Sequence, residues 1–266
     1  MRMTRDLISL AGRRVLITGA ASEIGRAVAL RFADAGADLI LLDADAAGLA
    51  QTAKEVSAIA GGVLAQVVDV ADKSQVDAFW KRISAGQGVP DTLINNAGAA
   101  LIRAHLDADG AHLERTVRAA LDSMLWMSQA FIAARGKRGG VIVNISSIEA
   151  LASLRDDLIP YTMGRAGAQA LTLALARAYG KRGFRVNALA PGAIHTPGTQ
   201  RLRDTTLRHL DMDLMKAGSH FDTSVALGRW GEADEVARVA LFLASDLASY
   251  VQGSILPVDG GILTPS

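Results

Sequence analysis

Short apolar segments alternate with longer amphipathic segments along most of the chain. The short ones are rich in leucine or β-branched residues, as in RVLIT at 14–18, DLILL at 38–42 and GVIVNIS at 140–146. The longer ones predict helices at about 22–35, 45–60, 72–85, 111–135, 160–181 and 232–245. Strands and helices that alternate at this spacing favour a parallel sheet with right-handed crossovers and helices on both faces. The sequence therefore predicts an α/β fold with a doubly wound, Rossmann-type sheet.

No repeat, low-complexity tract or linker divides the 266 residues, so we expect a single domain over 1–266. Further strands are predicted at VLAQVV, DTLIN, FRVNALA and SILPV. The longest segment without a clear pattern, roughly 192–230, begins beyond the carboxyl end of a strand. Because such folds bind ligands at that edge, we interpret this segment as a substrate lid.

Composition excludes several classes of protein. Hydrophobic residues make up 50% of the chain and the formal net charge is +1, which argues against a disordered tail and against a nucleic-acid-binding protein. With no cysteine, disulfides and thiolate metal sites are excluded, and no histidine–carboxylate spacing suggests a metal site. The chain shows neither a secretory signal nor an apolar run long enough to span a membrane. We therefore expect a cytoplasmic protein with no membrane partner.

The first strand runs directly into the turn TGAASEIG at 18–25, and a helical pattern follows at once. Small residues let the backbone approach a pyrophosphate, which the helix N-terminus stabilises with free N–H groups and its dipole. A tight turn with no ligand is the alternative interpretation. The candidate cofactor-binding residues of this turn are Gly19, Ser22, Glu23, Ile24 and Gly25.

Asp43 closes the second strand, eighteen residues after Gly25. An acidic side chain there can accept hydrogen bonds from the ribose 2′-hydroxyl of a dinucleotide. A 2′-phosphate would meet like charge, and no Lys or Arg stands beside Asp43 to offset it. NAD is therefore favoured over NADP, while the alternative is that Asp43 caps the helix that starts near Asp45.

Five motifs stand in one order along nearly the whole chain: the turn at 18–25, NNAG at 95–98, NISS at 144–147, Tyr161, and PG at 191–192. In this order they resemble the short-chain dehydrogenase/reductase family. The tail from GRWGEADEVARVALFLASDLASYVQGSILPVDGG is similar to the last helix and strand of that family's ketoacyl reductases and sugar or polyol dehydrogenases. The resemblance implies a Rossmann-type fold, a nicotinamide cofactor and an alcohol or carbonyl substrate.

The resemblance also assigns cofactor contacts beyond the turn. It implies that Asp69 and Val70 bind the adenine. It implies that two further groups line the rest of the dinucleotide: Asn95, Ala97 and Gly98, then Pro191, Gly192, Ile194 and Thr196. Asn95 can instead tie neighbouring strands together, and Thr196 can be a helix N-cap before Pro197.

Catalysis in the family uses a tyrosine, a serine and a cation, which here correspond to Tyr161, Ser147 and Arg165. Ser147 lies fourteen residues before Tyr161, one more than the commonest family spacing, and Ser146 is the less favoured choice. Arg165 lies four residues after Tyr161, on the same face of a predicted helix. A free tyrosine loses its proton near pH 10, so work near neutrality needs a neighbouring cation. Tyr161 and Arg165 also count among the cofactor-binding residues.

Three departures from the family pattern bear on activity. Arg165 replaces the usual lysine; it keeps a positive charge and a fork of donors but differs in bulk and planarity. Ala120 replaces an asparagine that holds a water in the proton relay. Glu23 replaces the middle glycine of the turn, where a carboxylate is tolerable if it points to solvent and interacts with the helix dipole.

The leading hypothesis is an NAD-dependent oxidoreductase that transfers hydride between the nicotinamide and a secondary alcohol or ketone. The alternative is a catalytically impaired protein of the same fold that binds a dinucleotide for a regulatory role. Gly164 and Gly167 suggest a close helix contact. The resemblance implies a homo-oligomer, a homotetramer or a dimer, with MLWM at 124–127 as a candidate face, although these residues can equally belong to the core of the chain. Weaker candidates for substrate contacts are His105, Asp156, Asp157, His195, Arg201, Arg203 and Arg208.

Overall fold

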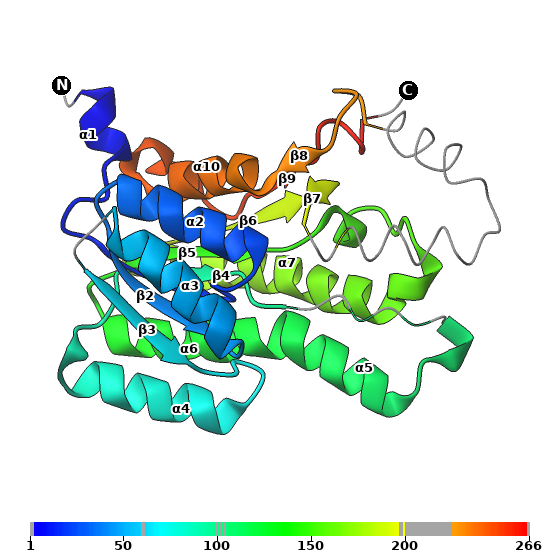
Figure 1. The fold of residues 1–266 in the computed structure, drawn as a ribbon, viewed down its shortest axis with the longest axis horizontal. Coiled ribbons are helices and arrows are strands. Elements are labelled where there is room, and N and C mark those ends of the chain that lie inside the picture. Colours follow the sequence, from blue (N-terminus) through cyan, green and yellow to red (C-terminus); the bar gives the residue numbers. More distant parts are fainter. Residues whose placement is uncertain are drawn as a thin grey trace.

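Parallel strands form the central sheet of the protein in the order β3-β2-β1-β4-β5-β6-β9 (Figure 1). The computed structural model describes residues 3–59, 62–98, 101, 103, 105–196, 199 and 225–264, except the side chains at 87 and 156. The strands are β1 (Arg14–Thr18), β2 (Asp38–Asp43), β3 (Val63–Val67), β4 (Thr92–Asn95), β5 (Gly140–Ile145), β6 (Phe184–Pro191) and β9 (Ile255–Val258). Most of their apolar runs are buried on both faces, as a sheet covered by helices requires.

Two apolar clusters, one on each face, join the helices to the sheet. One cluster packs α2 (Glu23–Asp34), α3 (Ala46–Ser57) and α10 (Ala233–Ala244) against the strands. The other packs α4 (Lys73–Arg82), α6 (Ser123–Arg135) and α7 (Ile159–Tyr179). Figure 1 shows α2 and α10 lying side by side, away from α4 and α6. The predicted α/β class and doubly wound Rossmann-type sheet are confirmed.

The single continuous helix predicted at 111–135 is interrupted in the structure. It is divided into α5 (Gly110–Val117), a π-helical turn at Arg118–Asp122 and α6. Single π-turns inside helices are uncommon and occur frequently at functional sites. Ala120 lies inside this turn and is fully buried.

Smaller elements complete the described part of the chain. A short helix, α1 (Thr4–Ile8), precedes β1, and the two-residue strands β7 (Ile194–His195) and β8 (Gly231–Glu232) pair in parallel after β6. Most of the predicted lid, including Arg201, Arg203 and Arg208, lies outside the described residues. Among the described residues, none of the helices is both long and apolar enough to cross a membrane.

Candidate active site

The carboxyl ends of the strands bring the motif residues to one edge of the sheet. Strand order reverses between β1 and β4, so the connections leave in opposite directions at this point. A doubly wound sheet binds its ligand at such a switch point. The turn after β1, the NNAG segment after β4 and the NISS segment at the end of β5 all lie along this edge.

The turn after β1 is held by close backbone contacts. Gly19 has φ +66°, and a Cβ there would lie 2.8 Å from the Cα of Ala97. A Cβ at Gly25 would overlap the carbonyl oxygen of Gly19. The Asn96 amide donates to the carbonyl oxygens of Thr18 (3.1 Å) and Gly19 (2.9 Å). Asn96 was not among the predicted site residues, although the NNAG motif contains it.

The start of α2 shows where Glu23 points. Ser22 is the N-cap, and its hydroxyl accepts from the N–H of Gly25 at 3.1 Å. Glu23 is exposed, and its carboxylate lies 3.6 Å from the guanidinium of Arg26. The Glu23 carboxylate thus lies on the surface of α2, next to Arg26, and not over the turn. Ile24 is partly buried against the core beneath α2.

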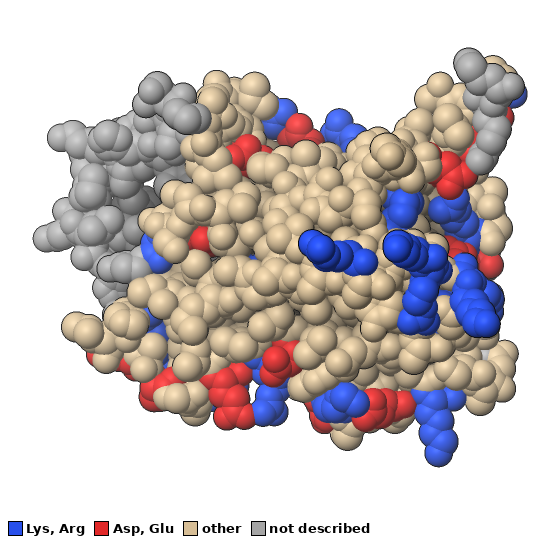
Figure 2. Space-filling model, turned by 180° about the vertical axis from the view of Figure 1, so that it is seen from behind, with Lys and Arg blue, Asp and Glu red and all other residues tan. Residues whose placement is uncertain are grey.

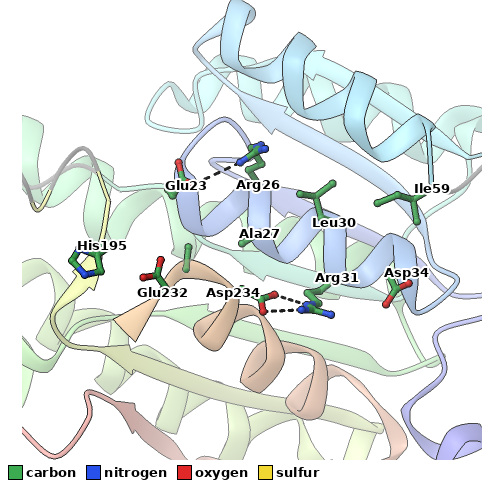
Figure 3. A pocket seen from close by; sticks show the side chains of 11 residues that line it. Glu23, Arg26, Ala27, Leu30, Arg31, Asp34, Ile59, His195, Glu232 and Asp234 are labelled. Atoms are coloured by element: carbon green, nitrogen blue, oxygen red, sulfur yellow. Dashed lines mark hydrogen bonds and ion pairs between the residues drawn. The ribbon is translucent and has the colours of Figure 1, made fainter. Parts of the chain in front are cut away.

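A groove beside this turn runs between α2 and the start of α10 (Figure 3). Its arginines are already paired, Arg26 with Glu55 and Arg31 with Asp234 through two hydrogen bonds. His195 lies at the other end of the groove and stacks on Trp230, with ring centres 5.2 Å apart. The arginines and the histidine of this groove are therefore engaged in contacts within the chain. Neither Tyr161 nor Ser147 lines the groove.

Asp43 is anchored in place by backbone donors. One carboxylate oxygen accepts from Ala21 N–H at 2.8 Å and the other from Asp45 N–H at 2.9 Å. The helix cap of α3 is Asp45 itself, whose side chain accepts from Ala47 and Gly48. Asp43 is thus oriented toward the turn after β1 and does not cap α3. At the next strand, Asp69 accepts from Ala71 N–H and is exposed, while Val70 is buried.

Asn95 lies inside the sheet edge, where its amide joins β4 to its neighbours. It donates to the side chains of Ser128 (3.1 Å) and Asn144 (2.9 Å). Its Oδ1 atom is buried without a partner among the described residues. The strand-tying interpretation therefore describes this residue, and the free acceptor leaves room for a further contact.

Arg165 lies beside Tyr161 and beneath the NNAG segment. Its guanidinium carbon is 5.2 Å from the centre of the Tyr161 ring, and Nη1 donates to the carbonyl oxygen of Ile145 at 2.7 Å. A Cβ at Gly98 would lie 2.9 Å from that guanidinium carbon. Arg165 is only 3% exposed, and its Nε has no partner among the described residues. A buried cation thus connects the tyrosine with the loop after β4.

The two serines of NISS have different surroundings. Ser146 is buried, donates to the carbonyl oxygen of Arg165 at 3.1 Å and accepts from Gln169 at 3.2 Å. Ser147 is partly exposed, and within the described part of the chain its hydroxyl accepts only from the N–H of Glu149, at 3.2 Å. Of the two serines, Ser147 is therefore the one whose hydroxyl proton has no acceptor among the described residues.

Ala120 and Gly164 are in close contact where the π-helical turn packs against α7. A Cβ at Gly164 would lie 2.8 Å from the Cβ of Ala120, and one at Gly167 would lie 2.7 Å from Leu121. The expected close helix contact is confirmed within the chain. Met124 and Met127 are fully buried in the chain's own interior, so they do not present an exposed face.

The segment after β6 combines tight turns and local bonds. Pro191 ends β6, and a Cβ at Gly192 would lie 2.7 Å from the Cβ of Asp259. Ile194 is buried in β7. The hydroxyl of Thr196 accepts from Thr199 N–H at 3.1 Å, which is the N-cap geometry that the sequence offered as the alternative.

Two of the weaker candidates for substrate contacts are either exposed or paired with another side chain. His105 is exposed in a short turn, and Asp157 pairs with Arg155. The side chain of Asp156 lies outside the described part of the chain. Within the ranges that the structure describes, His, Asp and Glu form no group that could hold a metal ion.

Glu149 is a feature of the site that the sequence analysis missed. It follows Ser147 by two residues and is 8% exposed, and its carboxylate accepts from Leu154 N–H at 3.0 Å. Burial raises the pKa of this carboxyl, and the Arg155 guanidinium acts in the opposite direction. The signal was available as an acidic residue within an otherwise apolar and small-residue stretch, SSIEALA.

Comparisons with known proteins agree with this geometry. Residues 19–263 match the family described as enoyl-(acyl carrier protein) reductase. Galactitol 2-dehydrogenase (L-tagatose-forming) of Cereibacter sphaeroides is 38% identical over 262 residues, 97% of this chain and 97% of that protein. A 3-oxoacyl-(acyl-carrier-protein) reductase of Thermotoga maritima is 34% identical over 255 residues, 96% of this chain and 99% of that protein. The chain belongs to the short-chain dehydrogenase/reductase family.

A solved member of this family superposes over almost the whole length. It is a Beutenbergia cavernae protein proposed to be an NAD(P)-dependent gluconate 5-dehydrogenase, with NADP bound at low occupancy. The TM-score is 0.89 at 32% identity, and the match covers 97% of this chain and 100% of that chain. The protein described here is accordingly an oxidoreductase of the short-chain dehydrogenase/reductase family.

The residues at the sheet edge fit the nicotinamide dinucleotide that the short-chain dehydrogenase/reductase family uses. Gly19, Gly25 and Gly98 leave no room for side chains where the backbone segments converge. Arg165 Nε and Asn95 Oδ1 are buried polar atoms without partners among the described residues. Buried polar groups are nearly always hydrogen-bonded, so both atoms are consistent with contacts to a bound ligand or its water.

Proposed function

We propose that the protein is an NAD-dependent dehydrogenase that oxidises a secondary alcohol of a polyol or sugar acid, or reduces the matching ketone. The observation that carries this proposal is the buried Arg165, whose guanidinium lies over the Tyr161 ring and packs against Gly98. It joins a proton-transfer group to the predicted cofactor loop. The substrate class rests on the names of the galactitol dehydrogenase and of the gluconate dehydrogenase structure.

In this proposal Ser147 and Tyr161 act on the substrate oxygen. A bound NAD supplies the hydride acceptor. The Ser147 hydroxyl donates a hydrogen bond to the alcohol oxygen, and the Tyr161 phenolate takes the hydroxyl proton. The O–H electron pair forms the C=O bond as the C–H bond breaks and its electron pair leaves with the hydrogen. Arg165 stabilises the phenolate by its permanent charge, and in reduction the same groups act in reverse.

The preference for NAD rests on Asp43. Its carboxylate is fixed by two backbone donors at the end of β2, so it cannot easily turn away from a ligand in the dinucleotide turn. A ribose 2′-hydroxyl can donate to this carboxylate, whereas a 2′-phosphate would be repelled. The other predicted cofactor-binding residues contact the pyrophosphate, the adenine and the nicotinamide of NAD, as the family resemblance implies.

The segment 192–230 is proposed as the substrate lid, and a homo-oligomer as the working form. On α7, Met163 and Leu173 are apolar and exposed, at 55% and 49%. Figure 2 shows a broad area without charged side chains on the face of the molecule opposite to that of Figure 1. Exposed apolar surface of this kind is common where protein copies associate. Location in the cytoplasm completes the proposal.

The proposal is tested by turnover with NAD and NADP side by side. The panel contains galactitol and other polyols, sugar acids, hydroxy acids, ketones and an oxoacyl thioester. We expect NADH formation with a polyol or sugar acid and a higher kcat/KM with NAD than with NADP. A preference for NADP would overturn the role of Asp43. Turnover of the oxoacyl thioester alone would overturn the substrate class.

A catalytically impaired dinucleotide-binding protein is the second candidate. It is favoured by one observation, the contact of Ala120 with Gly164, which fills the place where the family resemblance implies a relay asparagine. NADH binding measured by calorimetry, without turnover on any substrate of the panel, would support it. Gain of activity in an Ala120→Asn, Arg165→Lys double variant would support it further, whereas turnover by the unaltered protein excludes it.

A further inference from the structure

The loop between Ser147 and Tyr161 is folded around the buried carboxylate of Glu149. We propose that Glu149 is a positioning residue, which closes the 147–154 loop behind Ser147 and places a negative charge beside the reaction site. This inference rests on the proposed function, because the effect on catalysis passes through Ser147 and Tyr161.

Two hydrogen bonds define the loop. The N–H of Glu149 donates to Ser147 Oγ at 3.2 Å, and the Glu149 carboxylate accepts from Leu154 N–H at 3.0 Å. The residues between them form a 3-10 turn, Ile148–Ala150, that packs against α7 and β6. The Ser147 hydroxyl is thus held by an N–H of its own loop, and the Glu149 carboxylate closes that loop by accepting from Leu154. The Ser147 proton remains free to point at a substrate.

Among the residues that the structure describes, Glu149 has no full neutralising partner. Arg155 is the cation that acts on it, but Arg155 forms hydrogen bonds of 2.9 and 2.5 Å with Asp157. Asp157 repels the Glu149 charge in turn. The charged and titratable groups of the neighbouring elements are Arg165 and Tyr161 on α7, and Asp259, which lies across Gly192 near Ile148. The Asp259 carboxylate accepts from the N–H groups of residues 261 and 263.

This placement predicts an opposition between Glu149 and Arg165. Arg165 places a permanent positive charge against Tyr161, whose oxygen takes the substrate proton in the proposed oxidation. A negative charge on Glu149, two residues after Ser147, acts against a negative charge on that oxygen, since like charges repel. Once Glu149 is ionised, oxidation therefore requires a higher pH than it would with a neutral side chain. The hydrogen bond from Leu154 N–H also holds the Glu149 carboxylate in this position.

The variants Glu149→Gln and Glu149→Ala separate the effect of the hydrogen bond to Leu154 from the effect of the charge. The Gln side chain keeps an oxygen that can accept from Leu154 N–H but carries no charge, whereas Ala removes both. We expect the pH profile of oxidative kcat/KM in Glu149→Gln to move to lower pH by about one unit. We expect Glu149→Ala to lose about tenfold in kcat, with Gln restoring most of it. Glu114→Gln, an exposed change on α5, is the matched control and leaves both unchanged.

Two measurements without turnover keep the inference separate from the proposed function. The Leu154 amide should exchange its hydrogen at least about tenfold faster in Glu149→Ala than in the wild type, with Glu149→Gln in between. The Glu149 carboxyl carbon, assigned in NMR spectra by its absence in the Gln variant, should titrate above the ordinary glutamate value. Equal exchange in all three proteins, or an unshifted pH profile in Glu149→Gln, would overturn the inference. Failure of the wild type to turn over any substrate would instead count against the proposed function.

Discussion

The guanidinium carbon of Arg165 lies 5.2 Å from the centre of the Tyr161 ring. Both residues come from one turn of α7, and the contact places a permanent cation against the predicted proton-transfer group. Arg165 is buried and Tyr161 is partly buried, so the electrostatic effect is screened less than it would be at the surface. Arg165 therefore brings a permanent charge to this contact, and its planar guanidinium is held in place by the Ile145 carbonyl.

Loss of that charge should be costly. In Arg165→Met we expect kcat/KM to fall by at least about 100-fold, because the phenolate loses its cation and the Ile145 carbonyl its donor. Arg165→Lys keeps the charge and should stay within about tenfold of the wild type. Arg177→Met, on an exposed position of the same helix, is the control and should be neutral. Steady-state kinetics with NAD and the best polyol check all three, and full activity in Arg165→Met would refute the role of the cation.

Gly98 makes room for Arg165, so an added methyl should disturb both. Its φ is +149°, which side chains rarely adopt, and the new Cβ of Gly98→Ala would press against the guanidinium. We expect NADH affinity to fall by at least about tenfold and activity to fall with it. Calorimetry of NADH binding measures the change. Gly110→Ala, where the Cβ meets nothing within 4 Å, is the matched control, and equal affinities in the two variants would contradict the packing argument.

The contact between Ala120 and Gly164 should appear as an energetic coupling. Gly164→Ala overpacks this contact at a cost of about 1–3 kcal/mol, partly offset by about 1 kcal/mol of helix propensity. Adding Ala120→Gly relieves the overlap, so the double variant should be more stable than the two single effects predict. Denaturant unfolding of the four proteins in the cycle gives the coupling. Additive effects would mean that the two residues do not touch in solution.

Glu235 should make stability depend on pH. Hydrogen bonds from Arg229 lower its pKa from 4.5 to about 2, and it also accepts from Glu232 N–H at 2.9 Å. A carboxyl with a depressed pKa stabilises the fold above about 4.5, and this contribution is lost as the pH falls toward about 2. Because Arg229 is exposed, the contribution stays below about 1 kcal/mol.

Thermal unfolding of Glu235→Gln provides the measurement. The variant should melt lower than the wild type at neutral pH, by at most about 2–4 °C. The difference should shrink as the pH is lowered below about 4.5. Glu114→Gln removes an exposed pair with Arg118 and serves as the comparison. A difference that stays constant with pH would show that the Glu235 charge is not responsible.

Local patterns in the sequence predicted the sheet and the start of the site. The strands that end near Thr18, Asp43 and Asn95 are continuous apolar runs, and each is followed by a turn or helix signal that is visible within a few residues. Since parallel strands place their carboxyl ends at one edge, the meeting of these motifs followed from topology. The fold class and family were predictable for this reason.

Contacts between distant segments were not predictable in the same way. That Gly98 and the carbonyl of Ile145 enclose the Arg165 guanidinium depends on how β4, β5 and α7 pack. The π-helical turn around Ala120 has no periodicity signal of its own, because one inserted residue changes the hydrophobic pattern little. Glu149 was overlooked because a single acidic residue in a loop is ordinarily a solvated one.

The proton-transfer role of Tyr161 is the central claim. Its most direct test is the kcat/KM for oxidation of a polyol by NAD in the wild type and in Tyr161→Phe, which keeps the ring beneath Arg165 and removes the hydroxyl. Matching unfolding temperatures and NADH affinities would show that fold and cofactor site are intact. We predict a loss of about 10²–10⁴-fold in Tyr161→Phe. A kcat/KM equal to that of the wild type would contradict the account.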